Sequence, residues 1–116
     1  MSENKATVER YMDGFRASNH EQILDCLTAD VEWILPGAFH LHGKAAFDKE
    51  IENPAFSGSP VITVTRMTEQ AGVVVAEGFV GARRVDGTEL TLAMCDVFEM
   101  QDGKIRRLTS YLMEVR

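Results

Sequence analysis

The spacing of apolar residues predicts helices in the first half of the chain and long strands in the second half. Apolar residues follow helical spacing over residues 3–18, and a second helix is expected to begin at Asn19, a good N-cap. A third helix is expected to begin at Gly43 and to end at Asn53-Pro54. Alternation of apolar and polar residues predicts strands at 30–35, 60–69, 72–85, 88–100 and 104–115. Residues 38–42 are predicted to form a loop. Helices separated in this way from a mostly antiparallel sheet indicate an α+β fold.

One acidic residue interrupts an apolar face in the segment 90–100. Alternate residues of a strand share a face, and Asp96 shares its face with Leu90, Leu92, Met94, Phe98 and Met100. An acid in such surroundings loses hydration, so its pKa should rise and it should need a polar partner. Asp96 is therefore a candidate functional group.

The Asp86-Gly87 pair is a strong hairpin signal, and it sets the expected register of the strands on either side. With a two-residue turn, Glu77 lies directly opposite Asp96. Two carboxyl groups so close in apolar surroundings should not both ionise, so one could act as a base beside a neutral partner. A longer loop or a β-bulge would separate the two acids, and Glu77 would then pair with Arg83 or Arg84 or face solvent.

Composition and charge argue against several classes of partner. The 116 residues suit one domain, 1–116, and 45% hydrophobic with 26% charged residues is ordinary for a soluble globular protein. A net charge of -6 with scattered cations argues against nucleic acid or an anionic membrane, and no apolar run is long enough to span a bilayer. No signal peptide precedes the cysteines, so we expect reduced thiols in a cytoplasmic protein.

Two further patterns concern metals and subunit contacts. His40 and His42 could be two metal ligands or supply a base, but no third ligand with convincing spacing accompanies them. We therefore predict no metal and no cofactor, and keep His42 as a reserve base at the rim of a pocket. Cys95 lies on the face opposite to Asp96 with other small, uncharged residues, which fits burial of this outer face in a homodimer.

The order of elements and several motifs together resemble a known family. The motifs are a tryptophan-containing strand that ends at Pro36-Gly37, the segment 96–105 with its Asp-Gly-Lys-Ile turn, and the closing segment 110–114. They resemble the nuclear transport factor 2-like superfamily, in its SnoaL-like polyketide cyclase and ketosteroid isomerase branch. The resemblance implies a cone-shaped, curved, mostly antiparallel sheet that encloses an apolar pocket with three N-terminal helices, usually in a homodimer.

The resemblance also implies roles for individual residues. Tyr11, in the context Arg10-Tyr11, matches the tyrosine that donates a hydrogen bond to the substrate oxyanion of ketosteroid isomerases. Asp96, followed by Val97-Phe98, matches the protonated aspartic acid that is the second donor, an arrangement whose energetics are well known. The general base of those enzymes has no counterpart, because Trp33 or one of the next two apolar residues stands in its place.

Two functions of different classes remain open from the sequence. The first is a cofactor-free isomerase or cyclase that binds a small apolar carbonyl compound, with Tyr11 and protonated Asp96 holding the oxygen and Glu77 moving a proton. The alternative is a non-catalytic ligand-binding or dimerisation module of the same fold. In both cases the residues expected to line the pocket are Phe15, Trp33, His42, Phe79, Met94 and Phe98.

Overall fold

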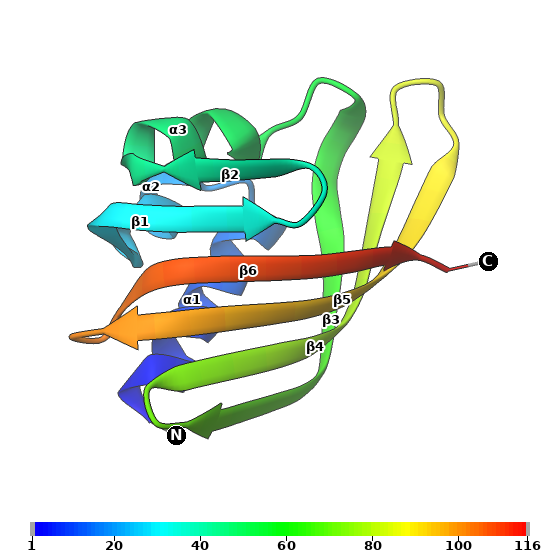
Figure 1. Ribbon diagram of the computed structural model, residues 1–116. Coiled ribbons are helices and arrows are strands. Elements are labelled where there is room, and N and C mark those ends of the chain that lie inside the picture. The colour runs from blue at the N-terminus through cyan, green and yellow to red at the C-terminus, as the bar shows by residue number, and fades with distance from the viewer. Residues whose placement is uncertain (1, 116) are drawn as a thin grey trace.

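Six strands form one curved sheet in the order β2-β1-β6-β5-β4-β3 (Figure 1). The computed structural model describes residues 2–115. Its elements are α1 (Glu3–Arg16), α2 (His20–Asp25), β1 (Leu27–Leu35), β2 (Phe39–His42), α3 (Gly43–Ile51), β3 (Phe56–Gln70), β4 (Val73–Arg84), β5 (Glu89–Gln101) and β6 (Lys104–Glu114). Neighbouring strands are antiparallel except for β1 and β6, which are parallel. The α+β fold with a curved, mostly antiparallel sheet is therefore confirmed.

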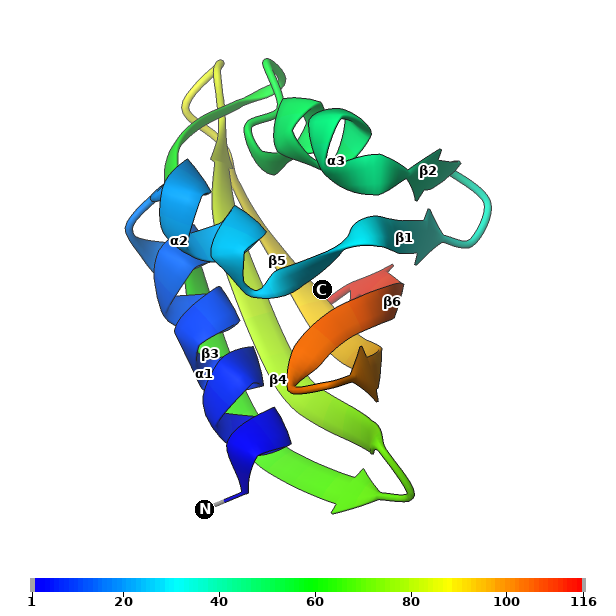
Figure 2. The ribbon, with the colours of Figure 1, turned by 90° about the vertical axis from the view of Figure 1, so that its left-hand side faces the viewer.

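The helices cover one face of the sheet, here called the inner face. Figure 2 shows α1 running along the sheet beside β3 and β4. Its buried stripe includes Tyr11, whose ring meets the inner-face residue Phe98 edge-on at 5.4 Å. From α3, Phe47 stacks on Trp33 of β1 at 4.4 Å. Within residues 2–115, no helix is long and apolar enough to cross a membrane.

The short strand β2 corrects the prediction of a loop at 38–42. After β1 the chain turns at Pro36-Gly37, where Gly37 has a φ of 83°, and comes back so that Leu41 pairs with Trp33. Four residues are too few for alternation to stand out in a sequence. The third helix consequently follows two strands, whereas the sequence predicted one strand before it.

The β4–β5 hairpin has a three-residue loop, so the predicted register is wrong. The Arg84 N–H donates to the Thr88 carbonyl at 2.8 Å, and the Gly87 N–H donates back to the Arg84 carbonyl at 2.9 Å. Gly87 takes a φ of 91°, as this loop type requires. The extra loop residue shifts the pairing by one position. As a result Ala76, and not Glu77, lies opposite Asp96.

The long strands of the sheet are curved (Figure 1), and Gly78 lies within one of them, β4. A register shift in β3 between Val64 and Arg66 lies directly across from this glycine. A Cβ atom added at Gly78 would lie 1.8 Å from the carbonyl oxygen of Thr63, so only glycine fits there. The bulge and the glycine together allow the close approach that curvature needs.

We expect Gly78→Ala to destabilise the protein by about 1–3 kcal/mol, because the backbone of β3 must move to admit the methyl group. Gly81→Ala is the matched control on the same strand, since the nearest atom to its added Cβ is the Val61 Cβ at 3.7 Å. That control should stay within about 0.5 kcal/mol of the parent. Urea unfolding of the three proteins measures both effects, and equal stabilities would contradict the packing argument.

Candidate functional site

A largely apolar cavity of about 570 Å³ lies between the helices and the inner face of the sheet. This volume suits a small organic molecule. The walls come from α1, from β1 and from the inner-face positions of β3 to β6, and include Tyr11, Phe15, Trp33, Ile62, Met94 and Leu112. Exposed residues after α3, among them Glu52 and Asn53, line another part of the cavity. The cavity thus has aromatic and aliphatic walls and few polar groups.

Asp96 is the buried acid of this cavity. It lies on the inner face of β5 and is only 8% exposed. Burial raises its pKa from 3.8 to about 6, and the nearby Ser110 hydroxyl limits that rise. The Oδ1 atom is buried and has no hydrogen-bond partner. A carboxyl group with a free oxygen and a pKa close to neutrality can both give and accept a proton.

Ser110 connects Asp96 to Trp33 across three strands. It is the direct cross-strand partner of Asp96 on β6, and its Oγ accepts a hydrogen bond from the Trp33 indole N–H at 3.1 Å. A hydroxyl that accepts from an indole keeps its own O–H for another acceptor. Donation to the ionised carboxylate explains why Ser110 lowers the pKa of Asp96 against the effect of burial.

Ser110 is a residue of the site that the sequence alone does not indicate. Counting back from the Asp102-Gly103 turn would place Thr109 opposite Asp96. A register shift between Glu99 and Met100 moves the pairing by one residue and brings Ser110 there instead. The useful signal is the parity of β6, on which Ser110 alternates with the exposed Tyr111.

Tyr11 supplies a neutral hydrogen-bond donor on the wall of the same cavity. Its pKa is raised well above the ordinary value, first by burial and then by the charge of Asp96. The phenol therefore stays protonated at neutral pH. Its ring is held edge-on against Phe98 and Phe47, and by Phe15 at 5.1 Å. Packing of this kind fixes where the hydroxyl group lies.

Two residues predicted for the site lie outside the cavity because the register differs. Glu77 is on the outer face, opposite Cys95, and forms an ion pair with Arg66 that lowers its pKa. Phe79 follows the same parity and is 45% exposed on the outer face. The prediction that Glu77 faces Asp96 was therefore wrong, and Glu77 cannot serve as a base in this cavity.

The remaining predicted pocket residues divide into three groups. Phe15, Trp33 and Met94 line the cavity. Phe98 is fully buried against Tyr11 and belongs to the core beneath the cavity wall. His42 lies on the outer face with its side chain 69% exposed, so its prediction as a rim residue was wrong. Strand parity explains this. Trp33 faces inward, so the adjacent Glu32 faces outward, and His42 shares that outer face as the cross-strand partner of Glu32.

The cavity can support chemistry that needs one acid and one neutral donor. Its other carboxyl group within the described chain, Glu52, is exposed and is hydrogen-bonded to His20 at 3.1 Å. Asp96 is therefore the buried titratable acid that a bound molecule would meet, with Tyr11 as the neutral donor. A single proton-transfer group of this kind suits either a proton shuttle or the binding of a polar oxygen.

The raised pKa of Asp96 makes a prediction about stability and pH. Because the folded protein holds this proton more tightly than the unfolded chain, the contribution of Asp96 to stability should fall as pH rises from 4 through 6 and then level off. Asp96→Asn removes that dependence. The free energy of unfolding of the variant relative to the parent should therefore increase by about 2 kcal/mol between pH 4 and pH 7. Urea unfolding across this range measures the difference, and a difference that does not vary with pH would show that Asp96 is not buried as described.

Comparisons with known proteins agree with this fold. The SnoaL-like domain family matches residues 8–108, and no curated protein matches the chain. The structure of TerC co-crystallised with polyporic acid has a TM-score of 0.86 and 25% sequence identity, and the match covers 94% of this chain and 90% of that chain. An NTF2-like protein from Burkholderia pseudomallei has a TM-score of 0.87 and 21% identity, with 97% and 92% covered.

A third similar structure comes from Xanthomonas campestris and is described as a candidate polyketide cyclase. Its TM-score is 0.85 at 22% identity, with 94% of this chain and 89% of that chain covered. At such identities the second and third structures show the fold alone. The family match spans most of the sequence, and the structural matches agree with it. The chain belongs to the SnoaL-like domain family.

Proposed function

We propose that the protein binds a small, largely apolar molecule with a carbonyl-type oxygen and transfers a proton next to that oxygen, as a cofactor-free isomerase or cyclase. One observation carries the proposal. Asp96 has a pKa of about 6 and an unpartnered, buried Oδ1 on the wall of a largely apolar cavity. Leaving such an oxygen without a partner is costly, so a ligand that supplies one gains affinity there.

Tyr11 and Asp96 have different roles in this proposal. Tyr11 donates its hydroxyl proton in a hydrogen bond to the ligand oxygen, where negative charge develops. Ionised Asp96 accepts the proton from the neighbouring carbon and returns it to another carbon, which completes an isomerisation without a second acid. With a ligand that binds as an oxyanion, protonated Asp96 instead acts as a second donor beside Tyr11.

The family and its structures support the choice of ligand class. TerC, at 25% identity, was co-crystallised with polyporic acid. The cavity of this chain has the size and the apolar walls that a molecule of that general kind needs. We therefore propose a small organic ligand that places a carbonyl-type oxygen between Tyr11 and Asp96.

A non-catalytic binding protein is the second candidate, and one observation favours it. The cavity wall offers one buried carboxyl group in the described chain, whereas Glu77 points away from it. If the Asp96 carboxyl group is hydrogen-bonded to the ligand oxygen, no group remains to remove a proton from a ligand carbon. Catalysis therefore requires that the Asp96 carboxylate contact the carbon that loses the proton, and not the ligand oxygen.

Proton exchange distinguishes these two functions. We expect the protein to catalyse deuterium exchange at carbon in at least one member of a panel of β,γ-unsaturated ketones, followed by NMR. Tyr11→Phe should slow the exchange by about 100-fold, because one donor to the developing oxyanion is lost. Asp96→Asn should abolish it. Tyr111→Phe is a matched control, since Tyr111 is exposed on the outer face, and it should leave the rate unchanged.

Saturable binding of panel members without exchange would contradict catalysis and support the binding protein. Binding can be followed through fluorescence of Trp33, the single tryptophan, which lines the cavity. Equal affinities in the parent, Tyr11→Phe and Asp96→Asn would contradict any role of these two groups toward the ligand.

We also propose that the outer face of the sheet pairs with a second copy of the chain. Phe79, Ala93 and Met113 form one cross-strand row, and Cys95 and Tyr111 belong to the next. Met113 is 71% exposed, so large apolar side chains stand on a face that the helices do not cover.

A charge at Met113, the β6 end of the first row, should separate the two copies. We expect the parent protein to sediment as a dimer at micromolar concentration and Met113→Glu to shift toward the monomer, because a buried unpaired carboxylate opposes association. Circular dichroism verifies that the variant is folded. A parent protein that sediments as a monomer would contradict the proposal.

A further inference from the structure

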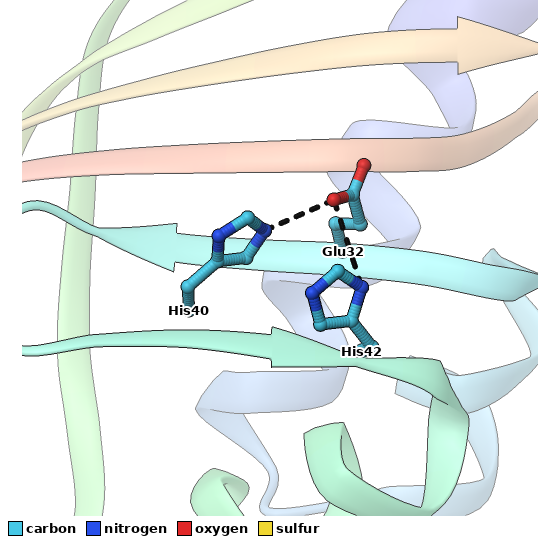
Figure 3. Close-up of side chains that lie close together, drawn as sticks. All are labelled: Glu32, His40 and His42. Carbon is cyan, nitrogen blue, oxygen red and sulfur yellow. Dashed lines mark hydrogen bonds and ion pairs between the residues drawn. The ribbon is translucent and has the colours of Figure 1, made fainter.

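Three polar side chains gather on the outer face at the edge formed by β1 and β2 (Figure 3). His40 and His42 alternate along β2 and therefore project from the same face. Glu32 of β1 is the direct cross-strand partner of His42. The two imidazole rings stack with centroids 4.5 Å apart and planes 24° apart. Strand pairing thus brings a carboxylate that lies eight residues before His40 in the sequence to the two histidines.

The donor atoms of these side chains converge on a small volume. The Glu32 Oε1 atom lies 2.9 Å from His40 Nε2 and 3.7 Å from His42 Nδ1. All three potential ligand atoms lie within 4.8 Å of one another. A tetrahedral metal ion about 2.0–2.1 Å from each ligand separates neighbouring ligand atoms by roughly 3.3 Å. Small side-chain rotations would therefore place all three atoms around one ion.

Arg107 of β6 orients the carboxylate for this purpose. Its Nε and Nη2 atoms donate to the second oxygen of Glu32, Oε2, at 3.0 and 2.9 Å. This leaves Oε1 turned toward the histidines, as Figure 3 shows. Glu99, 3.7 Å from Arg107, opposes the positive charge of the guanidinium group. Outer contacts of this kind commonly fix the ligands of metal sites.

We propose that Glu32, His40 and His42 form a binding site for a divalent transition metal ion of the zinc and copper class. Two imidazoles and one carboxylate suit these ions, whereas calcium and magnesium prefer sites made of oxygen ligands. His42 is largely exposed, so the ion keeps at least one position open to water. The site lies on the opposite face of β1 from Trp33 and the cavity, and the proposal does not depend on the proposed function.

The fold also explains why the sequence alone predicts no metal. The pair His40 and His42 was evident, but a third ligand near them in the sequence was not. Glu32 becomes the third ligand only through the β1–β2 hairpin, and β2 had been expected to be a loop. The metal would join the edge strand β2 to β1, and should therefore stabilise the folded protein.

The experiment uses the full chain without an affinity tag and two probes, Zn²⁺ and Cu²⁺. We expect calorimetry with Zn²⁺ to show one ion per chain, and Zn²⁺ to raise the melting temperature. Cu²⁺ should quench the fluorescence of Trp33, which is adjacent to Glu32 in the sequence, and Zn²⁺ should reverse that quenching by competition. His40→Gln and His42→Gln should each weaken Zn²⁺ binding at least tenfold.

His20→Gln is the matched control, because His20 is the third histidine of the chain and lies on α2 beside Asp48 and Glu52. It should bind Zn²⁺ like the parent. Circular dichroism verifies the fold of each variant, so that loss of binding is not loss of structure. Absence of saturable 1:1 binding in the parent would overturn the proposal, and so would equal weakening by His20→Gln and His40→Gln.

Discussion

The loss of hydration at the Asp96 carboxyl group is the interaction on which the candidate site depends. Burial among apolar side chains raises its pKa to about 6, and the single hydroxyl of Ser110 offsets only part of that cost. A carboxylate exposed to water would have an ordinary pKa and no need of a further partner. The same burial keeps Tyr11 protonated. The raised pKa values of Asp96 and Tyr11 therefore both depend on the apolar side chains around them.

Those walls exist because the sheet can bend. At Gly78 the backbone of β3 approaches so closely that no side chain fits, and the register shift beside it turns the strands toward the helices. Aromatic packing fixes the opposite wall, since Trp33 lies between Phe47 and Phe39 and also donates to Ser110. The hydrogen bond from Trp33 thus connects the core packing of β1 to the titration of Asp96 on β5.

Properties set within one strand could be predicted from the sequence, and properties set between strands could not. Alternation along 88–100 correctly places Asp96 on the inner face and Cys95 on the outer face. The identity of their neighbours depends on one residue in a loop or a bulge. Because the loop at Asp86-Gly87 has three residues, Glu77 lies outside the site. Because the register shifts near Glu99, Ser110 lies opposite Asp96.

The hairpin at the other edge of the sheet shows the same limit. Its strand β2 spans Phe39–His42 and is too short to be recognised from the sequence pattern. Without this strand, nothing in the sequence indicates that Glu32 lies beside the two histidines. Helix boundaries were more predictable, because capping is local. Asn19 accepts from the Gln22 N–H at 3.1 Å, as the sequence indicated. Interactions between residues close in sequence, such as helix capping, can be predicted from the sequence, whereas contacts across a sheet depend on the geometry of every connecting turn.

A cavity with one buried acid restricts the chemistry that it can perform. A mechanism with separate base and acid needs two groups with different pKa values in contact with the ligand, and the displacement of Glu77 to the outer face leaves Asp96 alone in that role. One carboxyl group can still take a proton from one carbon and return it to another, provided that its pKa lies near the working pH. A pKa of about 6 meets this condition. In the proposed function, the position of Asp96 therefore favours reactions in which one carboxyl group takes a proton from one carbon and returns it to another.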